Sequence, residues 1–230
     1  MVTDVRLSVR PPYHEGVSAE LRSIEQALRG HFGPRGDWDR WWPARSRFEV
    51  IAGAMLVQNT NWSNVVKALG VLRAAGRLSP AGVRELSEAE LGRLIRSSGC
   101  WRQKAKRLKG FVTWLDGAHG GSLGRLFAQP TAVAREQLLS LHGIGEETAD
   151  AILLFAGGHP SFVMDAYTRR ILERHGLPAS RAWVEAGVPR EERVYRHLHA
   201  HLVETAKQYC RKSAPDCHLC PLQPLLVARA

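Results

Sequence analysis

A tight glycine turn is the segment of this sequence best suited to chemistry. Residues 138–155 read LLSLHGIGEETADAILLF, in which residues 142–145 separate two apolar stretches with helical spacing. Glycines let a phosphate approach the backbone, and the amides that open the next helix carry the positive end of its dipole. The turn is therefore a candidate phosphate site that does not read base sequence. An ordinary hairpin between two helices is the alternative interpretation.

Three carboxylates accompany this turn. Glu146 and Glu147 follow it directly, where acids in the first turn of a helix interact favourably with the helix dipole. Asp165 comes about one helix later and precedes a helical segment, which is a good position for an N-cap. A carboxylate fixed in a cleft can also stabilise a developing positive charge and orient a water molecule. For Asp165 these structural and chemical roles are compatible.

Three of the four cysteines lie near the end of the sequence. Cys210, Cys217 and Cys220 have the spacing C-x6-C-x2-C, whereas Cys100 lies far from them. In a reducing compartment such a group more often binds a metal than forms disulfides. His218 lies inside the loop and would complete a zinc site of three cysteines and one histidine. A loop without metal is the remaining alternative.

The composition favours a polyanionic partner. The chain has 230 residues and a formal net charge of +10, and such a basic excess suits nucleic acid. An arginine-rich composition without binding meaning is the alternative. The first residues hold no apolar core of signal-peptide length, and no apolar run is long enough to span a bilayer. We therefore expect a cytoplasmic protein without a membrane partner, associated with the nucleoid if it is bacterial.

Apolar residues recur at helical spacing along most of the chain, which predicts an all-α fold. Ser87 and Glu90 form a candidate capping box at the start of one helix. The predicted helical segments are residues 19–32, 48–60, 63–76, 87–99, 100–115, 165–176 and 191–210. The segment 100–115 is amphipathic and basic, with Lys104, Lys106, Arg107 and Lys109 on a face that would hold phosphates or simply face solvent.

Several motifs occur together in one order. They are residues 48–65, 97–110, 138–155, 163–171 and 210–220. In this combination the sequence resembles the helix-hairpin-helix DNA glycosylases of the endonuclease III superfamily. The resemblance implies two helical domains around a cleft: a helical barrel of residues 40–160 that carries the hairpin, and a discontinuous domain of residues 1–39 and 161–230 that carries the cysteine loop 210–220. It also implies that the protein is a monomer that binds double-stranded DNA with a damaged base.

The resemblance assigns roles to individual residues. Asp165 would stabilise the positive charge that builds on the sugar as the base leaves, and Gln58 would fill the gap left by the flipped base. The residues expected to bind DNA phosphates are His142, Gly143, Ile144, Gly145, Thr148, Lys104 and Lys106. Glu147 stands where strand-nicking members carry a lysine, and a carboxylate cannot form an imine with the sugar. The chain therefore resembles a glycosylase that uses water, and repulsion between Glu147 and Asp165 would raise one of their pKa values.

Aromatic residues point to the substrate. Trp41, Trp42, Pro43 and Trp62 resemble the pocket of the 3-methyladenine glycosylases in this superfamily, and indole faces favour an electron-poor or cationic base. Packing between domains is the alternative role for these tryptophans. Two other functions stay open: a glycosylase with AP lyase activity on oxidised pyrimidines, as in endonuclease III, and a DNA-binding protein without catalysis.

The resemblance also concerns the cofactor. The spacing of Cys210, Cys217 and Cys220 is similar to that of the first three ligands of the family's [4Fe–4S] loop. The fourth ligand is expected at position 226, which is a leucine. A [4Fe–4S] cluster is therefore expected with an incomplete ligand set, and zinc or no metal are the alternatives.

Overall fold

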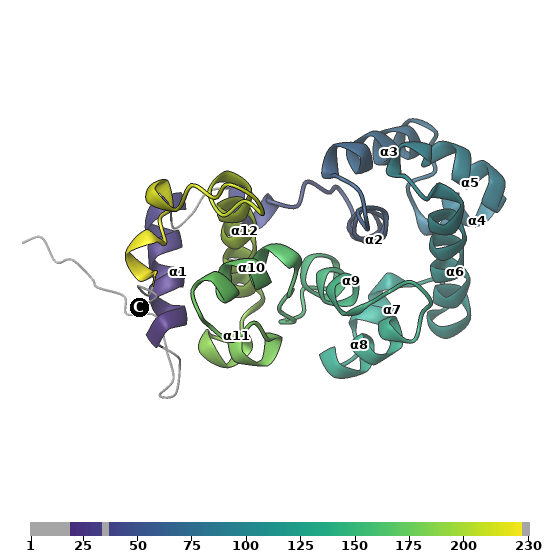
Figure 1. Cartoon of the computed structure of the whole chain (residues 1–230). Helices are drawn as coiled ribbons and strands as arrows, with labels where there is room; N and C mark the ends of the chain where they lie inside the picture. Colours follow the sequence, from purple (N-terminus) through teal and green to yellow (C-terminus); the bar gives the residue numbers. More distant parts are fainter. Residues whose placement is uncertain (1–18, 34–36, 227–230) are drawn as a thin grey trace, which may run out of the picture.

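The computed structural model describes residues 19–33 and 37–226 and is built from helices, with no strand among these residues. Residues 1–18, which include the whole N-terminal segment on which the absence of a signal peptide was predicted, lie outside the described residues. In Figure 1 the helices form two groups, with α2 to α9 on the right and α1 with α10 to α12 on the left. The all-α prediction is confirmed.

The first group contains eight α-helices and a short 3-10 turn. They are α2 (Arg47–Leu56), α3 (Trp62–Ala74), α4 (Pro80–Glu85), α5 (Glu88–Leu94), η2 (Arg96–Ser98), α6 (Trp101–His119), α7 (Leu123–Phe127), α8 (Thr131–Leu139) and α9 (Glu146–Ala151). Helix α2 lies at the centre of this group, and every residue from Phe48 to Leu56 is buried. Its nearly continuous apolar sequence therefore reflects contact with neighbours on all sides. The predicted capping box of Ser87 and Glu90 is confirmed at the start of α5.

The second group contains the chain segments before and after the first. Its elements are α1 (Ala19–Phe32), η1 (Asp37–Arg40), α10 (Ala166–Arg174), α11 (Arg181–Gly187), α12 (Glu192–Gln208), η4 (Cys217–Leu219) and η5 (Gln223–Leu225). Helix α1 buries Leu21, Ile24 and Leu28, the predicted apolar stripe, and packs against α12, α11 and η5. Segments from the two ends of the chain thus share one core.

Two connections join the groups. One is the segment between η1 and α2, which contains the tryptophans at positions 41 and 42. The other is η3 (Ile152–Gly157), a π-helical continuation of α9 that contacts α2, α8 and α12. The sequence predicted a regular helix through this region, but the wider turn occurs where the helix passes from one group to the other. None of the helices in the described part of the chain has the length and apolar character needed to cross a bilayer.

Candidate active site

A cleft of about 1020 Å³ opens between the two groups and collects most of the predicted site residues. Those that line it are Trp41, Trp42, Pro43, Gln58, Trp62, Gly143, Gly145, Glu147, Thr148 and Asp165. They come from the η1–α2 connection, the end of α2, the start of α3, the hairpin and the start of α10. The cleft therefore combines carboxylates, an anion-binding turn and an aromatic wall, although these residues are far apart in the sequence.

Asp165 is buried at the N-terminus of α10. Its backbone is extended (φ −85°, ψ 175°), and its Oδ1 accepts a hydrogen bond of 2.7 Å from the backbone N–H of Thr168. This is the N-cap geometry that the sequence predicted. The bond fixes the carboxylate at the wall of the cleft, and its other oxygen has no protein partner among the described residues. Asp165 can therefore act as a preorganised negative charge.

Glu147 lies in the first turn of α9 and faces the same cleft. Its side chain keeps contact with solvent, yet the surrounding walls remove part of its hydration, and this desolvation raises its pKa. The nearby charge of Asp165 raises the pKa further, while Arg169 opposes the shift. The repulsion expected from the sequence therefore contributes to the raised pKa of Glu147, after the larger effect of desolvation.

The hairpin has the expected tight turn between α8 and α9. Gly143 has a φ of 87°, a backbone conformation that favours glycine, and a Cβ on it would also displace the end of the Arg107 side chain. Gly145 is the N-cap residue of α9, while Ile144 is buried and His142 is exposed. The turn thus exposes backbone to solvent at Gly145 while Ile144 packs into the core, and its binding of phosphate stays a prediction.

Gln58 follows α2 and is attached to the hairpin. Its Nε2 donates to the carbonyl of Gly143 (2.9 Å) and to Oγ1 of Thr148 (3.0 Å), and its Oε1 accepts from Arg107 (3.0 Å). The side chain lines the cleft, but these three bonds hold it against the hairpin wall. A role as the residue that fills the DNA stack would require it to exchange them, and this role stays a prediction.

The aromatic wall is continuous. Trp42 meets Trp62 edge to face at a ring separation of 5.4 Å and contacts Phe155 of η3 at 5.1 Å. Gly53 of α2 lies beneath both indoles, since a Cβ there would be 3.4 Å from each of them. These tryptophans also pack against the core, so they are half-buried rather than free. The same rings therefore pack against the core and line the cleft, and their role in binding a damaged base stays a prediction.

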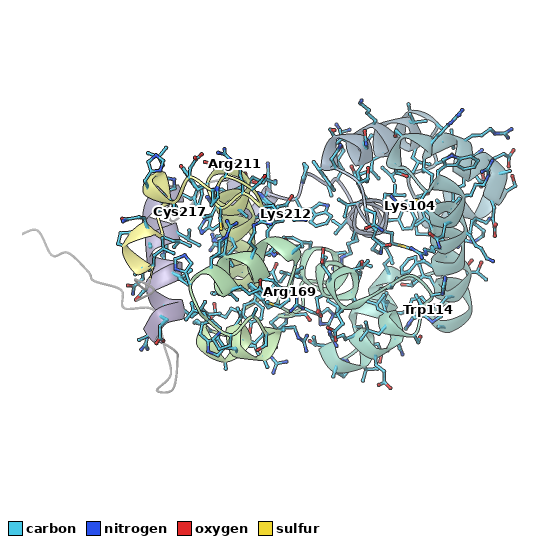
Figure 2. All side chains as sticks on the ribbon, viewed as in Figure 1. Lys104, Trp114, Arg169, Arg211, Lys212 and Cys217 are labelled. Atoms are coloured by element: carbon cyan, nitrogen blue, oxygen red, sulfur yellow. The ribbon has the colours of Figure 1, made fainter. Side chains whose placement is uncertain are left out.

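The basic face of α6 is different from the prediction. Lys104 is buried and donates from Nζ to the carbonyl oxygens of Leu56 (2.8 Å) and Ser98 (2.5 Å) (Figure 2). Burial lowers its pKa. The prediction that Lys104 binds a DNA phosphate is wrong, because its ammonium satisfies two carbonyls at the ends of neighbouring helices. Lys106 is exposed and stays a candidate, whereas Lys109 donates to three carbonyls near the end of α4.

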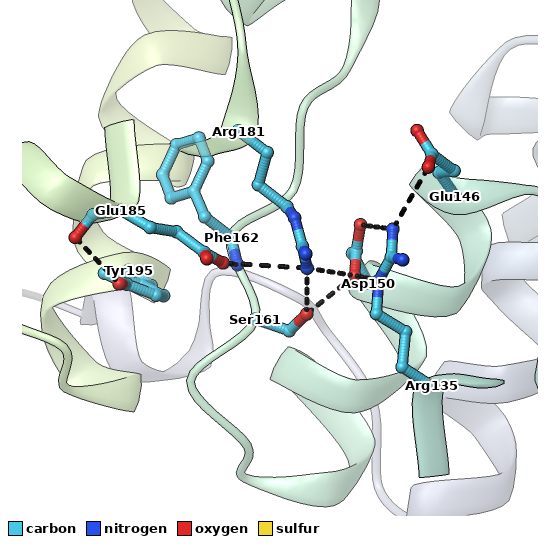
Figure 3. A network of polar contacts seen from close by, with 8 residues as sticks. All are labelled: Arg135, Glu146, Asp150, Ser161, Phe162, Arg181, Glu185 and Tyr195. Atoms are coloured by element: carbon cyan, nitrogen blue, oxygen red, sulfur yellow. Dashed lines mark hydrogen bonds and ion pairs between the residues drawn. The ribbon is translucent and has the colours of Figure 1, made fainter. Parts of the chain in front are cut away.

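A buried charge network that the sequence analysis missed supports the hairpin. Asp150 of α9 accepts from Arg135 on α8, from Ser161 and from Arg181 on α11 (Figure 3). Arg135 also approaches Glu146 at 3.5 Å. The network therefore joins both helices of the hairpin to the second group of helices. No local sequence pattern predicts the network, because its bonded pairs are separated by up to 31 positions.

The cleft is also lined by residues that the predicted site did not include, among them Tyr167, His199, Glu204 and Lys207. Burial lowers the pKa of His199, which keeps the imidazole neutral despite the negative charge of Asp165. The residues at positions 199, 204 and 207 lie on α12, at the far end of the sequence from the tryptophans they face. A polar side chain in an otherwise apolar helical stripe was the available signal.

The cysteine loop does not form a metal site in the described part of the chain. No three His, Cys, Asp or Glu side chains there are placed to hold a metal ion, and Leu226 stands at the expected fourth position. Burial raises the pKa of Cys220, a backbone hydrogen bond from Leu222 opposes this shift, and the charges of Cys210 and Cys217 add to it. Arg174 donates to Sγ of Cys210 (3.2 Å) and to the carbonyl of Arg211 (2.8 Å). This donor set does not fit a four-thiolate cluster. The hydrogen bonds from Arg174 instead hold the start of the loop, and Figure 2 labels Cys217 farther along it.

Comparison with known proteins identifies the family. The model of the HhH-GPD superfamily of base excision DNA repair proteins matches residues 52–198, which include the hairpin and Asp165. The chain belongs to this superfamily. The provisionally named DNA repair glycosylase MJ1434 of Methanocaldococcus jannaschii is 37% identical over 217 residues, which cover 91% of this chain and 96% of that protein. Endonuclease III of Thermotoga maritima is 28% identical over 186 residues, covering 76% of this chain and 80% of the relative.

Solved structures have the same architecture as this HhH-GPD protein. The 3-methyladenine DNA glycosylase MagIII of H. pylori, bound to 1,N6-ethenoadenine, superposes with a TM-score of 0.70 at 26% identity, covering 82% of this chain and 97% of that chain. An endonuclease III–DNA complex superposes with a TM-score of 0.72 at 24% identity, covering 90% of this chain and 94% of that chain. The likeness to MagIII is thus one of fold and sequence, whereas the likeness to the endonuclease III complex is one of fold alone. The sequence-based assignment to the endonuclease III-like glycosylases is confirmed.

Proposed function

We propose that this DNA glycosylase is monofunctional and hydrolyses the N-glycosidic bond of a damaged base flipped out of double-stranded DNA. The observation that carries the proposal is the cleft itself, in which Asp165 and Glu147 face an aromatic wall beside the hairpin. Cleavage of the bond builds positive charge on the sugar, which the Asp165 carboxylate stabilises. The exposed turn of the hairpin holds the phosphates of the bound strand.

Water, rather than a lysine, attacks the sugar in this proposal. Glu147 offers no amine, and Lys104 is buried against two backbone carbonyls. Among the described residues Lys207 is the lysine that lines the cleft, and its ammonium pairs with Glu204 at 2.9 Å. This amine would have to lose its proton and leave Glu204 before it could form an imine. No step of the hydrolysis uses the cysteine loop.

An alkylated purine such as 3-methyladenine is the proposed substrate. The wall of Trp42, Trp62 and Phe155 offers large apolar surface to a planar ring, and electron-poor purines stack favourably on indole faces. The likeness to a 3-methyladenine DNA glycosylase supports the same class. An alkylated purine also leaves easily, so the site needs little acid catalysis.

The substrate is tested with duplexes that carry 3-methyladenine, thymine glycol or uracil. Release of free 3-methyladenine in preference to the two pyrimidines supports the proposal. Faster release of thymine glycol would instead assign the chain to the oxidised-pyrimidine branch. Binding to all three duplexes without any base release would show a DNA-binding protein without catalysis.

The monofunctional assignment is tested on an abasic duplex with and without borohydride. The wild-type protein leaves the strand intact and forms no trapped complex, because no amine is placed for imine formation. Glu147→Lys places an amine beside Asp165 and gains trapping and strand nicking. Efficient trapping of the wild type would overturn the assignment, and loss of that trapping in Lys207→Met would identify the amine.

A further inference from the structure

The indole of Trp41 is held from the opposite wall of the cleft. Its Nε1 donates to Oε1 of Glu204 on α12 at 3.0 Å, a contact between residues 163 positions apart. The ring also meets His199 of the same helix edge to face, with 5.6 Å between ring centres. The connection that carries Trp41 is irregular, so the direction of this ring depends on tertiary contacts, and α12 supplies its hydrogen bond.

A second polar side chain of α12, Lys207, contacts both Glu204 and the Trp41 ring. Lys207 donates from Nζ to the same Glu204 oxygen at 2.9 Å, and its ammonium lies 5.6 Å from the centre of the Trp41 ring. The positions 204 and 207 are one helical turn apart, so the carboxylate and the ammonium lie together beside the indole. The three side chains form one unit, which we call the Trp41 clamp.

The clamp places two opposite charges at the wall of the base pocket. The face of an indole ring attracts cations. The Lys207 ammonium already lies beside the Trp41 ring, and this weakens the attraction of the ring for a second cation. Without Glu204, the ammonium would repel a positively charged base near Trp41. Without Lys207, the carboxylate would attract one. His199 adds no charge here because burial lowers its pKa, and the other charged groups that line the cleft are Arg107, Glu146, Glu147 and Asp165.

We propose that Glu204 is a positioning residue for Trp41 and that the Glu204–Lys207 pair sets the preference of the pocket between cationic and neutral damaged bases. This inference rests on the proposed glycosylase function and adds specificity determinants to it. The balanced pair lets one pocket accept both cationic alkylpurines and neutral modified purines. Changing either charge shifts the preference in a predictable direction.

The charge preference is tested by two variants that remove one charge each. Glu204→Gln keeps an oxygen acceptor for the indole and leaves Lys207 uncompensated. Lys207→Met keeps an apolar side chain of similar length and leaves Glu204 uncompensated. The measurement is the ratio of kcat/KM for 3-methyladenine, which is cationic in DNA, to kcat/KM for the neutral 1,N6-ethenoadenine. Glu204→Gln lowers this ratio and Lys207→Met raises it, each by roughly fivefold, the effect of one unit charge near a solvated site.

A matched control removes a charge outside the cleft. Glu88 is exposed on α5 and does not line the pocket, so Glu88→Gln leaves the ratio at the wild-type value. Ratios that stay constant in both test variants, or move in the same direction, would overturn the proposed role of the pair. Release of neither base by the wild type would instead refute the proposed function.

The positioning of Trp41 has a readout that needs no activity. In a 15N spectrum of the tryptophan indoles, the Trp41 N–H resonance is identified by its loss in Trp41→Phe. Glu204→Ala shifts this resonance because its acceptor is removed, and Glu204→Gln returns it toward the wild-type position. A Trp41 resonance that is the same in wild type and Glu204→Ala would show that α12 does not hold the indole, whatever the enzyme does to DNA.

Discussion

Asp165 combines a structural and a chemical role in one side chain, and one substitution separates them. Asparagine is as good an N-cap as aspartate, so Asp165→Asn keeps the bond to the Thr168 amide and the helix start. It removes the negative charge that faces the sugar. We expect base release to fall by about a hundredfold or more, while the melting temperature and DNA affinity change little. Single-turnover kinetics on a lesion duplex measure the effect, and near-normal turnover would remove Asp165 from the mechanism.

The ionised form of Glu147 destabilises the folded protein, so its effect on stability depends on pH. Its pKa is raised above the ordinary value of 4.5, so the folded protein binds this proton more tightly than the unfolded chain does. The contribution of protonated Glu147 to the free energy of unfolding is fully present in acid. It is lost as the pH rises from the ordinary pKa through the raised pKa. Glu147→Gln should therefore be more stable than wild type near neutral pH and show no such gain in acid below 4.5. Urea unfolding across this range measures it, and an equal difference at every pH would contradict the shift.

The sequence predicted single residues well where their role is local. The cap at Asp165 and the turn glycine at position 143 depend on a few neighbouring residues and were found. The role of Lys104 was predicted wrongly because one of its two acceptors, the carbonyl of Leu56, comes near it only after α2 packs against α6. Its other acceptor is the nearby carbonyl of Ser98. A basic residue on an amphipathic helix has the same spacing whether it faces a phosphate or the end of another helix.

At the scale of elements, the hairpin depends on a buried charge. The side chain of Asp150 is 2% exposed and bonds to Arg135, Ser161 and Arg181. Asp150→Ala would remove the buried carboxylate that Arg135 and Arg181 share, and removing one partner of such a network costs about 3–5 kcal/mol. Equilibrium unfolding in urea measures this loss. The exposed pair of Arg77 and Glu85 gives the control, since Glu85→Gln should cost less than about 1 kcal/mol.

Element boundaries and element contacts were unequally predictable. Helix α1 begins and ends where the apolar stripe indicated, because its buried face repeats with the helical period. The π-helical η3 was not predicted, since its wider turn reflects packing against α2 and α12 rather than a local signal. The same limit applies to the Trp41 clamp, whose partners are separated by 163 positions.

At the scale of the whole molecule, the two groups of helices need each other to complete the site. The first group supplies the hairpin and Gln58, and the second supplies Asp165 and the side chains of α12. The sequence predicted a cleft between two domains from the order of its motifs. It did not predict which residues of α12 face the tryptophans, because several histidines and charged residues of that helix share the same spacing. The packing of α12 against η1 and η3 determines which of these side chains line the cleft.

The net charge of +10 makes a last prediction about DNA binding, in which two lysines of one helix behave differently. Each phosphate neutralised by a protein cation releases a counterion, so the logarithm of the binding constant falls with the logarithm of salt concentration by about 0.9 per contact. Lys106 is exposed on α6, and Lys106→Ala should reduce this slope by about one contact on undamaged duplex. Lys104 is buried, so Lys104→Met should leave the slope unchanged and lower the free energy of unfolding, because two carbonyls lose their donor. Fluorescence anisotropy over a salt series, with urea unfolding of both variants, separates the two effects. A reduced slope for Lys104→Met would mean that its ammonium reaches the DNA after all, and an unchanged slope for Lys106→Ala would place the phosphate contacts elsewhere than on α6.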